Sequence, residues 1–309
     1  MPDDPGESFV LNTLLRDAGP GGASTLRVPP GDDAAILADG LVLTQDAFIE
    51  GVHWDERFSG ADVGWRLAMA NLSDLNAMGA RGVWAMLSIA MPKPLDRSWV
   101  EGFSQGFSQA LNQVPLIGGD TCSSPGPKAL SATLGGRLVA APILRSGASA
   151  GDEIWVSGQL GAAAGGYYGI ASLLSAFLRP MPPLTLGPAL AERALVTSGM
   201  DLSDGLSQDL HRLCAASGVS AQIDPTSLPL PAALMDRSDP VADAVGFGED
   251  FELLFTARPQ DNVAVRTLGE SLGVSLSCIG HIQAGSGPPT LGQRAWPVGW
   301  SHFGTEAPC

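Results

Sequence analysis

Apolar and polar positions between residues 41 and 138 follow two different periods. Between 62 and 78 the apolar residues recur at every third or fourth position, which predicts a largely buried helix. The same spacing predicts an amphipathic helix over 99–111, and the apolar runs at 82–91 and 129–138 predict strands. Helices and strands that follow one another in this way predict an α/β or α+β domain.

Two shorter strands are expected directly before acidic residues. Residues 41–44 follow a turn and lead to Asp46, and residues 115–119 are expected to form a buried strand that opens onto Asp120. Strand ends are where α/β proteins place ligand groups. The two glycines before Asp120 would also allow the backbone to approach a phosphate closely.

A second unit is expected from the change of pattern near residues 145–151, where glycine and serine interrupt the chain. Strands are predicted at 153–157 and 251–256, with a helix between them that carries a leucine stripe from Leu206 to Leu213. We therefore expect two domains, residues 1–142 and residues 143–309, with the second also of the α/β type.

The glycine-rich string G-Q-L-G-A-A-A-G-G at 158–166 allows two interpretations. It could cradle a phosphate, as glycine-rich turns before helices do, but it does not match the G-x-G-x-x-G spacing. Tight packing of a strand against a helix explains the glycines equally well.

Composition narrows the class of protein. Of the 309 residues, 45% are hydrophobic and 16% charged, which is typical of a packed globular chain. The formal net charge is -15, and Lys93 and Lys128 are the two lysines, so there is no basic surface for nucleic acid. The acidic N-terminus resembles no signal peptide, and no apolar run is long enough to span a bilayer. A soluble cytoplasmic enzyme is expected, with neither nucleic acid nor a membrane as partner.

Cysteine and histidine give no sign of a zinc site or of a disulfide framework. The four cysteines and the four histidines are dispersed along the chain, without the close spacing of metal ligands. The cysteines are therefore expected to be free thiols.

Five short acidic motifs carry the candidate chemistry. Each places aspartate beside glycine, serine or threonine: G-D-D at 31–33, T-Q-D at 44–46, N-L-S-D at 71–74, G-G-D at 118–120 and D-L-S-D-G at 201–205. Mg²⁺ prefers oxygen ligands and is often shared between carboxylates and substrate phosphates. The chain has no lysine-bearing phosphate loop, so these aspartates are expected to meet around metal ions and one nucleotide.

Two of the motifs also have a simpler explanation. A side chain of D-L-S-D-G could cap the helix that follows it, and G-D-D could be a surface turn. Asn71 and Asp74 form a polar notch in an otherwise apolar helix and need partners, which a bound metal would supply.

Three further residues remain open between a binding role and a structural one. Arg145 precedes a glycine-punctuated loop and could clamp a phosphate or be a solvated surface residue. Glu249 lies just before a predicted strand, and His53 is a lone histidine, which is more often structural than catalytic.

Seven segments, taken in chain order, resemble the thiamine-monophosphate kinase family. They are G-D-D-A-A-I-L, T-Q-D-A-F-I-E-G-V-H-W, A-N-L-S-D-L-N-A-M-G-A, L-I-G-G-D-T, R-S-G-A-S-A-G-D, M-D-L-S-D-G-L-S-Q-D-L and G-E-D-F-E-L-L-F-T. The similarity runs from about Gly31 to the C-terminal W-S-H-F. The family belongs to a superfamily of ATP-using enzymes that includes aminoimidazole ribonucleotide synthetase.

The resemblance implies a two-domain α/β (α+β) fold of the aminoimidazole ribonucleotide synthetase type, with an N-terminal mixed sheet that pairs across a homodimer. It implies transfer of the γ-phosphoryl group of ATP to thiamine monophosphate, which yields thiamine diphosphate in the last step of its biosynthesis. Several Mg²⁺ ions would assist a direct in-line transfer, with no phosphoenzyme and no separate catalytic side chain.

The resemblance also assigns residues. The implied Mg²⁺ ligands are Asp33, Thr44, Asp46, Asp74, Asp120, Asp201 and Asp204. The implied ATP contacts are Gly119, Asp120, Arg145 and Ser203, and the implied contacts to thiamine monophosphate are His53, Glu249 and an aromatic residue, Trp300, with Trp296 as its rival.

Gln45 departs from the family pattern, which has threonine or serine there. If the family's contact is a side-chain hydroxyl, the carboxamide must replace it, and if it is the backbone carbonyl, nothing changes. Two alternative functions remain: another ATP-dependent member of the superfamily, of the ring-synthetase or selenophosphate synthetase type, and a non-catalytic protein that binds nucleotide or divalent ions. The absence of a reactive cysteine and of a glycine-rich lysine segment near the N-terminus disfavours selenophosphate synthetase.

Overall fold

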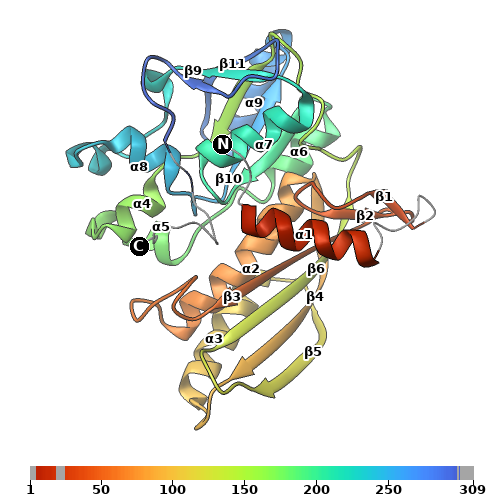
Figure 1. Cartoon of the computed structure of the whole chain (residues 1–309), viewed down its shortest axis with the longest axis vertical. Helices are drawn as coiled ribbons and strands as arrows, with labels where there is room; N and C mark the ends of the chain where they lie inside the picture. Colours follow the sequence, from red (N-terminus) through yellow and green to blue (C-terminus); the bar gives the residue numbers. More distant parts are fainter. Residues whose placement is uncertain (1–4, 19–24, 298, 300–309) are drawn as a thin grey trace.

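Two six-stranded sheets form the framework of the protein, and they lie one below the other in Figure 1. The computed structural model describes residues 5–18, 25–297 and 299. The first sheet is built from residues 26–138 and the second from residues 153–291. This arrangement confirms the mixed α/β class with two sheet-containing domains. The exact boundary between residues 142 and 143 stays a prediction.

The first sheet has the strand order β1-β2-β3-β6-β4-β5. Only the β4–β5 pair is parallel among the strand pairs described, so the sheet is mixed. The strands are β1 Leu26–Val28, β2 Ala35–Leu37, β3 Leu41–Ile49, β4 Ala80–Met91, β5 Leu116–Ser123 and β6 Ala129–Leu138. The predicted strands at 82–91 and 129–138 are confirmed, and the strand expected at 41–44 continues to Ile49.

Strand β5 differs from the prediction. A buried strand was expected before Asp120, but every residue of β5 is exposed. The reason is that β5 is the last strand of the sheet, at the lower right of Figure 1, where no helix of this domain covers it in the described part of the chain. The pairing of β5 with β4 explains why residue 119 is a glycine, since a Cβ atom there would lie 1.8 Å from the carbonyl oxygen of Leu87 on β4.

Helices α2 (Gly60–Ala77) and α3 (Arg97–Leu111) pack together on one face of this sheet, as the periodicity predicts. Helix α2 begins with a capping box in which Ser59 and Asp62 satisfy each other's backbone N–H groups. The two helices approach closely at glycines: a Cβ atom at Gly64 would lie 2.2 Å from the carbonyl oxygen of Phe103.

The second sheet has the order β12-β9-β11-β7-β10-β8 and is covered on both faces. Side chains of β7 alternate: Ile154 and Val156 join a core with Leu210 of α7, whereas Trp155 joins a core with Leu190 of α6 and Leu268 of α9. The strands are β7 Glu153–Ser157, β8 Ser198–Leu202, β9 Ser220–Ile223, β10 Glu252–Ala257, β11 Leu276–Gln283 and β12 Thr290–Leu291. The helices are α4 Ala162–Tyr167, α5 Leu174–Leu178, α6 Leu186–Glu192, α7 Leu206–Ser217, α8 Pro240–Gly246 and α9 Asn262–Leu272.

Helix α2 also connects the two halves. Its residue Ala77 belongs to the core formed by α6, α9 and the second sheet. The side-chain oxygen of Asn76 accepts a hydrogen bond of 2.9 Å from the backbone N–H of Gly187 at the start of α6. One helix is therefore packed in both halves, and the space beside it is bounded by both sheets.

Helix α1 (Pro5–Ala18) crosses the front of the molecule near α7 in Figure 1. Its residues Leu11 and Leu15 line the cavity described below, and Leu11 is exposed, as are Phe9 and Leu14. Among the residues that the structure describes, no helix is both long and apolar enough to cross a membrane.

Candidate active site

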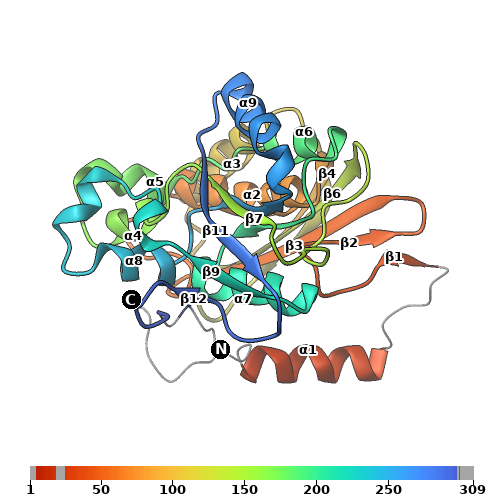
Figure 2. The same cartoon turned by 90° about the horizontal axis from the view of Figure 1, so that it is seen from above.

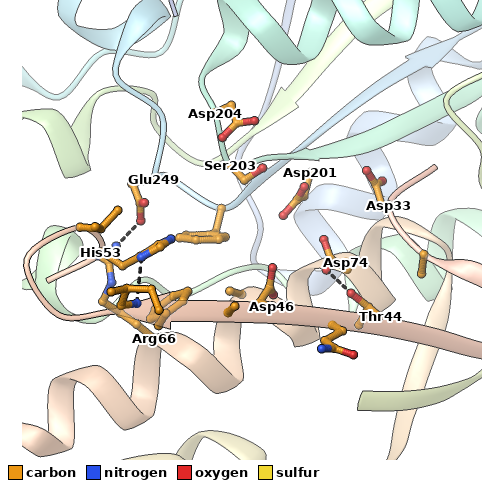
Figure 3. Close-up of a pocket in the computed structure, with 18 of the residues that line it drawn as sticks. Asp33, Thr44, Asp46, His53, Arg66, Asp74, Asp201, Ser203, Asp204 and Glu249 are labelled. Carbon is orange, nitrogen blue, oxygen red and sulfur yellow. Dashed lines mark hydrogen bonds and ion pairs between the residues drawn. The ribbon is translucent and has the colours of Figure 1, made fainter. Parts of the chain in front are cut away.

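A cavity of about 1430 Å³ lies between the two halves. Figure 3 shows its acidic side chains pointing toward one another from β3, α2 and the segment after β8. Ten of the residues predicted from the sequence line it: Asp33, Thr44, Asp46, His53, Asp74, Arg145, Asp201, Ser203, Asp204 and Glu249. Four of the five acidic motifs thus meet in one place, and the individual roles of their residues stay predictions.

Strand β3 places Thr44 and Asp46 on the face that looks toward α2, because alternate residues of a strand share a face. The Thr44 hydroxyl donates a hydrogen bond to the Asp74 carboxylate. Gln45 has its side chain on the opposite face, where it bonds to Ser131 and Thr133 of β6. Gln45 is nevertheless among the residues that line the cavity. Because its carboxamide is bonded to β6, the interpretation in which its backbone makes the contact is favoured.

Helix α2 lines the cavity with Arg66, Ala70 and Asp74, which recur at the spacing of one helical face. Asn71 lies outside this face. Its amide donates 2.9 Å to the carbonyl oxygen of Leu67, and it does not line the cavity. The polar notch expected to need a metal thus contributes Asp74 to the cavity and leaves Asn71 inside the protein.

The D-L-S-D-G segment begins with Asp201 near the end of β8 and leads to Gly205, directly before α7. Gly205 caps α7 without any side-chain hydrogen bond, so the capping explanation for the acidic residues does not hold. Asp201 Oδ2 instead accepts a hydrogen bond of 2.7 Å from Ser73 Oγ on α2. Arg212 on α7 donates to both Asp204 and Asp209.

Arg145 is a partner of the acidic site and not a solvated surface residue. Its Nε and Nη2 atoms donate to Asp33 Oδ1 at 2.9 and 2.6 Å. Its backbone N–H donates to the carboxylate of Asp32, whose pKa burial raises to about 6. One arginine therefore holds both aspartates of the G-D-D motif.

The carboxylates of the cavity are destabilised in their charged form. Burial raises the pKa of Asp46 to about 6, with a further contribution from the charge of Glu249. Burial and the charge of Asp33 raise the pKa of Asp201 to about 8, and burial raises that of Asp74 well above its ordinary value. Several buried carboxylates that oppose one another's ionisation are typical of a site built for cations.

The donor set fits a hard divalent cation. Asp33 Oδ2 and Asp46 Oδ2 are buried without any hydrogen-bond partner, and an oxygen-seeking ion would satisfy both and favour the charged carboxylates. Within residues 5–18, 25–297 and 299, however, no three histidine, cysteine or acidic side chains are close enough together to hold a metal ion as they stand.

The end of the cavity away from the aspartates is lined by aromatic side chains. Phe58, Tyr167, Phe177 and Phe247 line it together with His53 and Glu249. His53 Nδ1 accepts a hydrogen bond of 3.0 Å from the backbone N–H of Ile49, which places the ring proton of the neutral imidazole on Nε2. This end offers flat apolar surface beside polar groups, as expected for an organic substrate.

Sequence reasoning missed Arg66, which pairs with Glu249 in this end of the cavity. A signal was available, since Arg66 lies eight positions before Asp74 and thus on the same helical face. The aromatic residues come from segments far apart in the sequence, and nothing in their local pattern connects them.

Three of the predicted residues lie elsewhere, and a fourth falls outside the described part of the chain. Gly119 and Asp120 are on the exposed strand β5 and do not line the cavity. Trp300 lies outside the described residues. Its rival Trp296 does not line the cavity either, and its indole N–H donates to the carbonyl oxygen of Ser207.

The glycine-rich string at 158–166 is explained by packing. A Cβ atom at Gly165 would lie 2.3 Å from the side chain of Leu173, and one at Gly166 would lie 2.5 Å from the carbonyl oxygen of Leu173 and 2.7 Å from the side chain of Phe177. Asp250, which follows Glu249, accepts hydrogen bonds from the backbone N–H groups of Gly161 and Ala163.

Comparison with known proteins agrees with the family resemblance found in the sequence, both for the separate domains and for whole chains. Residues 31–138 match the family model for the N-terminal domain of AIR synthase related proteins, and residues 149–288 match the one for the C-terminal domain. The thiamine-monophosphate kinase of Salmonella typhimurium is 35% identical over 304 residues, which cover 89% of this chain and 91% of that protein. The one from Synechococcus elongatus is 37% identical and covers 82% of this chain and 83% of its own.

Solved structures agree with the sequence relatives. The crystal structure of thiamine-monophosphate kinase from Stenotrophomonas maltophilia superposes with a TM-score of 0.77 at 37% identity, covering 94% of this chain and 96% of that one. AaThiL complexed with AMPPCP and TMP superposes with a TM-score of 0.83 at 28% identity, covering 96% and 97%. With its acidic motifs gathered in one cavity and these similarities over nearly its full length, the chain belongs to the thiamine-monophosphate kinase family of AIR synthase related proteins.

Proposed function

We propose that this protein transfers the γ-phosphoryl group of ATP to thiamine monophosphate, producing thiamine diphosphate and ADP. The observation that carries the proposal is the single cavity in which four acidic motifs meet at one end and His53, Glu249 and aromatic rings meet at the other. A related structure was solved with both AMPPCP and TMP, an ATP analogue and the acceptor. The cytoplasmic location expected from the sequence stays a prediction.

Mg²⁺ is the proposed metal cofactor, held by Asp33, Thr44, Asp46, Asp74, Asp201 and Asp204. When bound, it would neutralise phosphate charge on both substrates, which otherwise repel each other. The partnerless oxygens of Asp33 and Asp46 and the raised pKa values of Asp46 and Asp201 support this assignment.

The protein's own groups position the two substrates. Arg145 is proposed to contact the phosphates of ATP, for which it must share or exchange its present ion pair with Asp33. Ser203 is proposed to contact ATP as well. The Nε2–H of His53 is suited to donate to a phosphate oxygen of the acceptor. That phosphate is itself largely ionised near neutral pH, so attack on the γ-phosphorus needs no strong base. In-line transfer without a phosphoenzyme is therefore part of the proposal.

A homodimer is proposed to complete the site. Asp120 is exposed on β5, whose neighbours Leu116 and Ile117 are exposed large apolar residues. An unpaired apolar edge strand is suited to pair with another chain. Since Gly119 and Asp120 do not line the cavity of their own chain, we assign them to the ATP site of the second copy.

The function is tested by incubating purified protein with ATP, Mg²⁺ and either thiamine monophosphate, thiamine or an aminoimidazole precursor, and identifying products by mass. Thiamine diphosphate formed from thiamine monophosphate alone, and abolished by EDTA, is the expected result. A folded, ATP-binding protein that makes no thiamine diphosphate would show that the acceptor is a different molecule. ATP-dependent turnover of the aminoimidazole precursor would favour the ring-synthetase alternative.

A further inference from the structure

Arg66 is a buried cation at the acceptor end of the cavity. Its side chain is 1% exposed, and it projects from α2 over the rings of Phe58 and Phe177, whose centroids lie 5.1 and 5.4 Å from the guanidinium carbon. Such a charge is costly to bury unless it is paired. The groups that pair with Arg66 therefore determine what this buried charge does.

The guanidinium reaches two separate segments of the second half. It donates to the carbonyl oxygen of Phe177 on α5 and to the carboxylate of Glu249, which precedes β10. The Nε atom of Arg66 is buried without a hydrogen-bond partner. The planar guanidinium of Arg66 thus donates to one carbonyl oxygen and one carboxylate at the same time. The ammonium group of a lysine, which is a single point charge, cannot reproduce both interactions.

Glu249 is held from its backbone as well. Its φ angle of 63° lies in the left-handed region, which non-glycine residues rarely adopt. Its N–H donates 2.8 Å to the carbonyl oxygen of Ser203, next to the acidic motif after β8. Backbone and side chain together determine where the carboxylate stands, and the ion pair with Arg66 connects it to α2.

We propose that Arg66 is a positioning residue for the acceptor substrate: it fixes Glu249 at the aromatic end of the cavity and thereby sets the affinity for thiamine monophosphate, with little effect on ATP. The inference rests on the proposed function. Asp33, Asp74 and Asp201 lie toward the other end of the cavity in Figure 3, where the metal ions and the phosphates of ATP are proposed to bind.

Arg179 offers a matched control. It forms another ion pair between the two halves, with Asp62 of the same helix α2, and its guanidinium lies over the ring of Trp65. Arg179 does not line the main cavity. If Arg66 acted only by holding the two halves together, the loss of Arg179 would have the same kinetic effect as the loss of Arg66.

The experiment compares Arg66→Met, Arg66→Lys and Arg179→Met with the wild type, measuring KM for each substrate and the affinity for thiamine monophosphate by calorimetry. For Arg66→Met we expect the KM and Kd for thiamine monophosphate to rise roughly ten- to a hundredfold, the range for losing a hydrogen bond to a charged group. The KM for ATP should stay within about twofold. Arg66→Lys should fall between Arg66→Met and wild type, and Arg179→Met should match wild type.

A second arm tests whether Arg66 acts through Glu249. In a Glu249→Gln background the substitution Arg66→Met should add little, because two residues that act as one unit are not additive. Additive effects, equal rises in both KM values, or the same effect from Arg179→Met would overturn the inference. If Arg66→Met fails to fold, an unchanged acceptor KM in Arg66→Lys would overturn it instead. A wild type that makes no thiamine diphosphate would refute the proposed function, and this inference with it.

Discussion

Ser73 Oγ donates a hydrogen bond of 2.7 Å to Asp201 Oδ2, and this bond joins helix α2 of the first half to strand β8 of the second. Both side chains are buried, so the bond is made away from competing water. It favours the charged form of the Asp201 carboxyl and so lowers its pKa, although burial and the charge of Asp33 still raise that pKa to about 8.

The substitution Ser73→Ala should therefore raise the pKa of Asp201 further and leave its carboxylate less well held. We expect lower activity, with the acidic limb of the pH–activity profile moved to higher pH, and a loss of about 1–3 kcal/mol in the free energy of unfolding. Ser131→Ala is the matched control, since Ser131 bonds to Gln45 on the exposed face of the first sheet. An unchanged pH profile in Ser73→Ala would contradict the positioning of Asp201 by this bond.

The substitution Asp74→Asn should abolish turnover while the protein remains folded. The carboxyl group of Asp74 faces the charges of Asp46 and Asp201, which oppose its ionisation. Its neutral replacement should leave the metal-free protein at least as stable in thermal melts, but lower activity by a factor of about a hundred or more. Near-normal turnover would remove Asp74 from the proposed metal site.

Stability of the metal-free protein should fall as the pH rises. An unfolded aspartate has a pKa of about 3.9, whereas the folded pKa is about 6 for Asp46 and about 8 for Asp201. Between these values the folded state binds more protons than the unfolded state, so deprotonation favours unfolding. In EDTA, thermal melts should give a higher Tm at about pH 5 than at about pH 8.

Added Mg²⁺ should reverse this trend, because a cation stabilises the charged carboxylates. We expect the rise in Tm on adding MgCl₂ to be larger at about pH 8 than at about pH 5. A rise that is independent of pH would mean that the ion binds outside this cluster.

Mixed dimers test the proposed place of Asp120. Asp74→Asn and Asp120→Asn should each be inactive alone. If Asp120 serves the partner's site, half of the randomly mixed dimers contain one intact site, so mixing should restore about a quarter of wild-type activity. If the mixture stays inactive although mass spectrometry, with one variant labelled with ¹⁵N, shows that subunits have exchanged, Asp120 serves its own chain or none.

The close contact between α2 and α3 makes a prediction about stability alone. A Cβ atom at Gly106 would lie 1.9 Å from the carbonyl oxygen of Ala61, whereas at Gly102 the nearest atom would be 3.5 Å away. Gly106→Ala should cost about 1–3 kcal/mol through overpacking. Gly102→Ala should be neutral or gain up to about 1 kcal/mol in helix propensity. Denaturant titrations of both variants measure the difference.

Local sequence patterns were sufficient to predict those helices and strands that bury one face against the core. The apolar spacing over 62–78 predicted α2, and the run at 129–138 predicted β6, because in both cases one surface of the element meets the core. Strand β5 was wrongly expected to be buried, since its apolar residues do not reveal that it lies at the end of a sheet. That position is set by strand order, which is a property of the whole domain.

The candidate site was predicted to the extent that its residues carry a recognisable local motif. Asp33, Asp46, Asp74 and Asp201 were named from their neighbours in the sequence, and the fold brings them together. Asp120 bears the same kind of motif and lies outside the cavity, so the motif alone does not determine position. Arg66 has no motif, and its role depends on pairing with Glu249, 183 residues away.

The hydrogen bond between Asn76 and Gly187 has a consequence for how the chain can be divided. A Cβ atom at Gly187 would lie 1.7 Å from the carbonyl oxygen of Asn76, so α2 and α6 touch with no side chain between them. A chimera that joins the first half of one relative to the second half of another would have to match this contact atom for atom. The two halves are therefore expected to be inherited and exchanged as one piece.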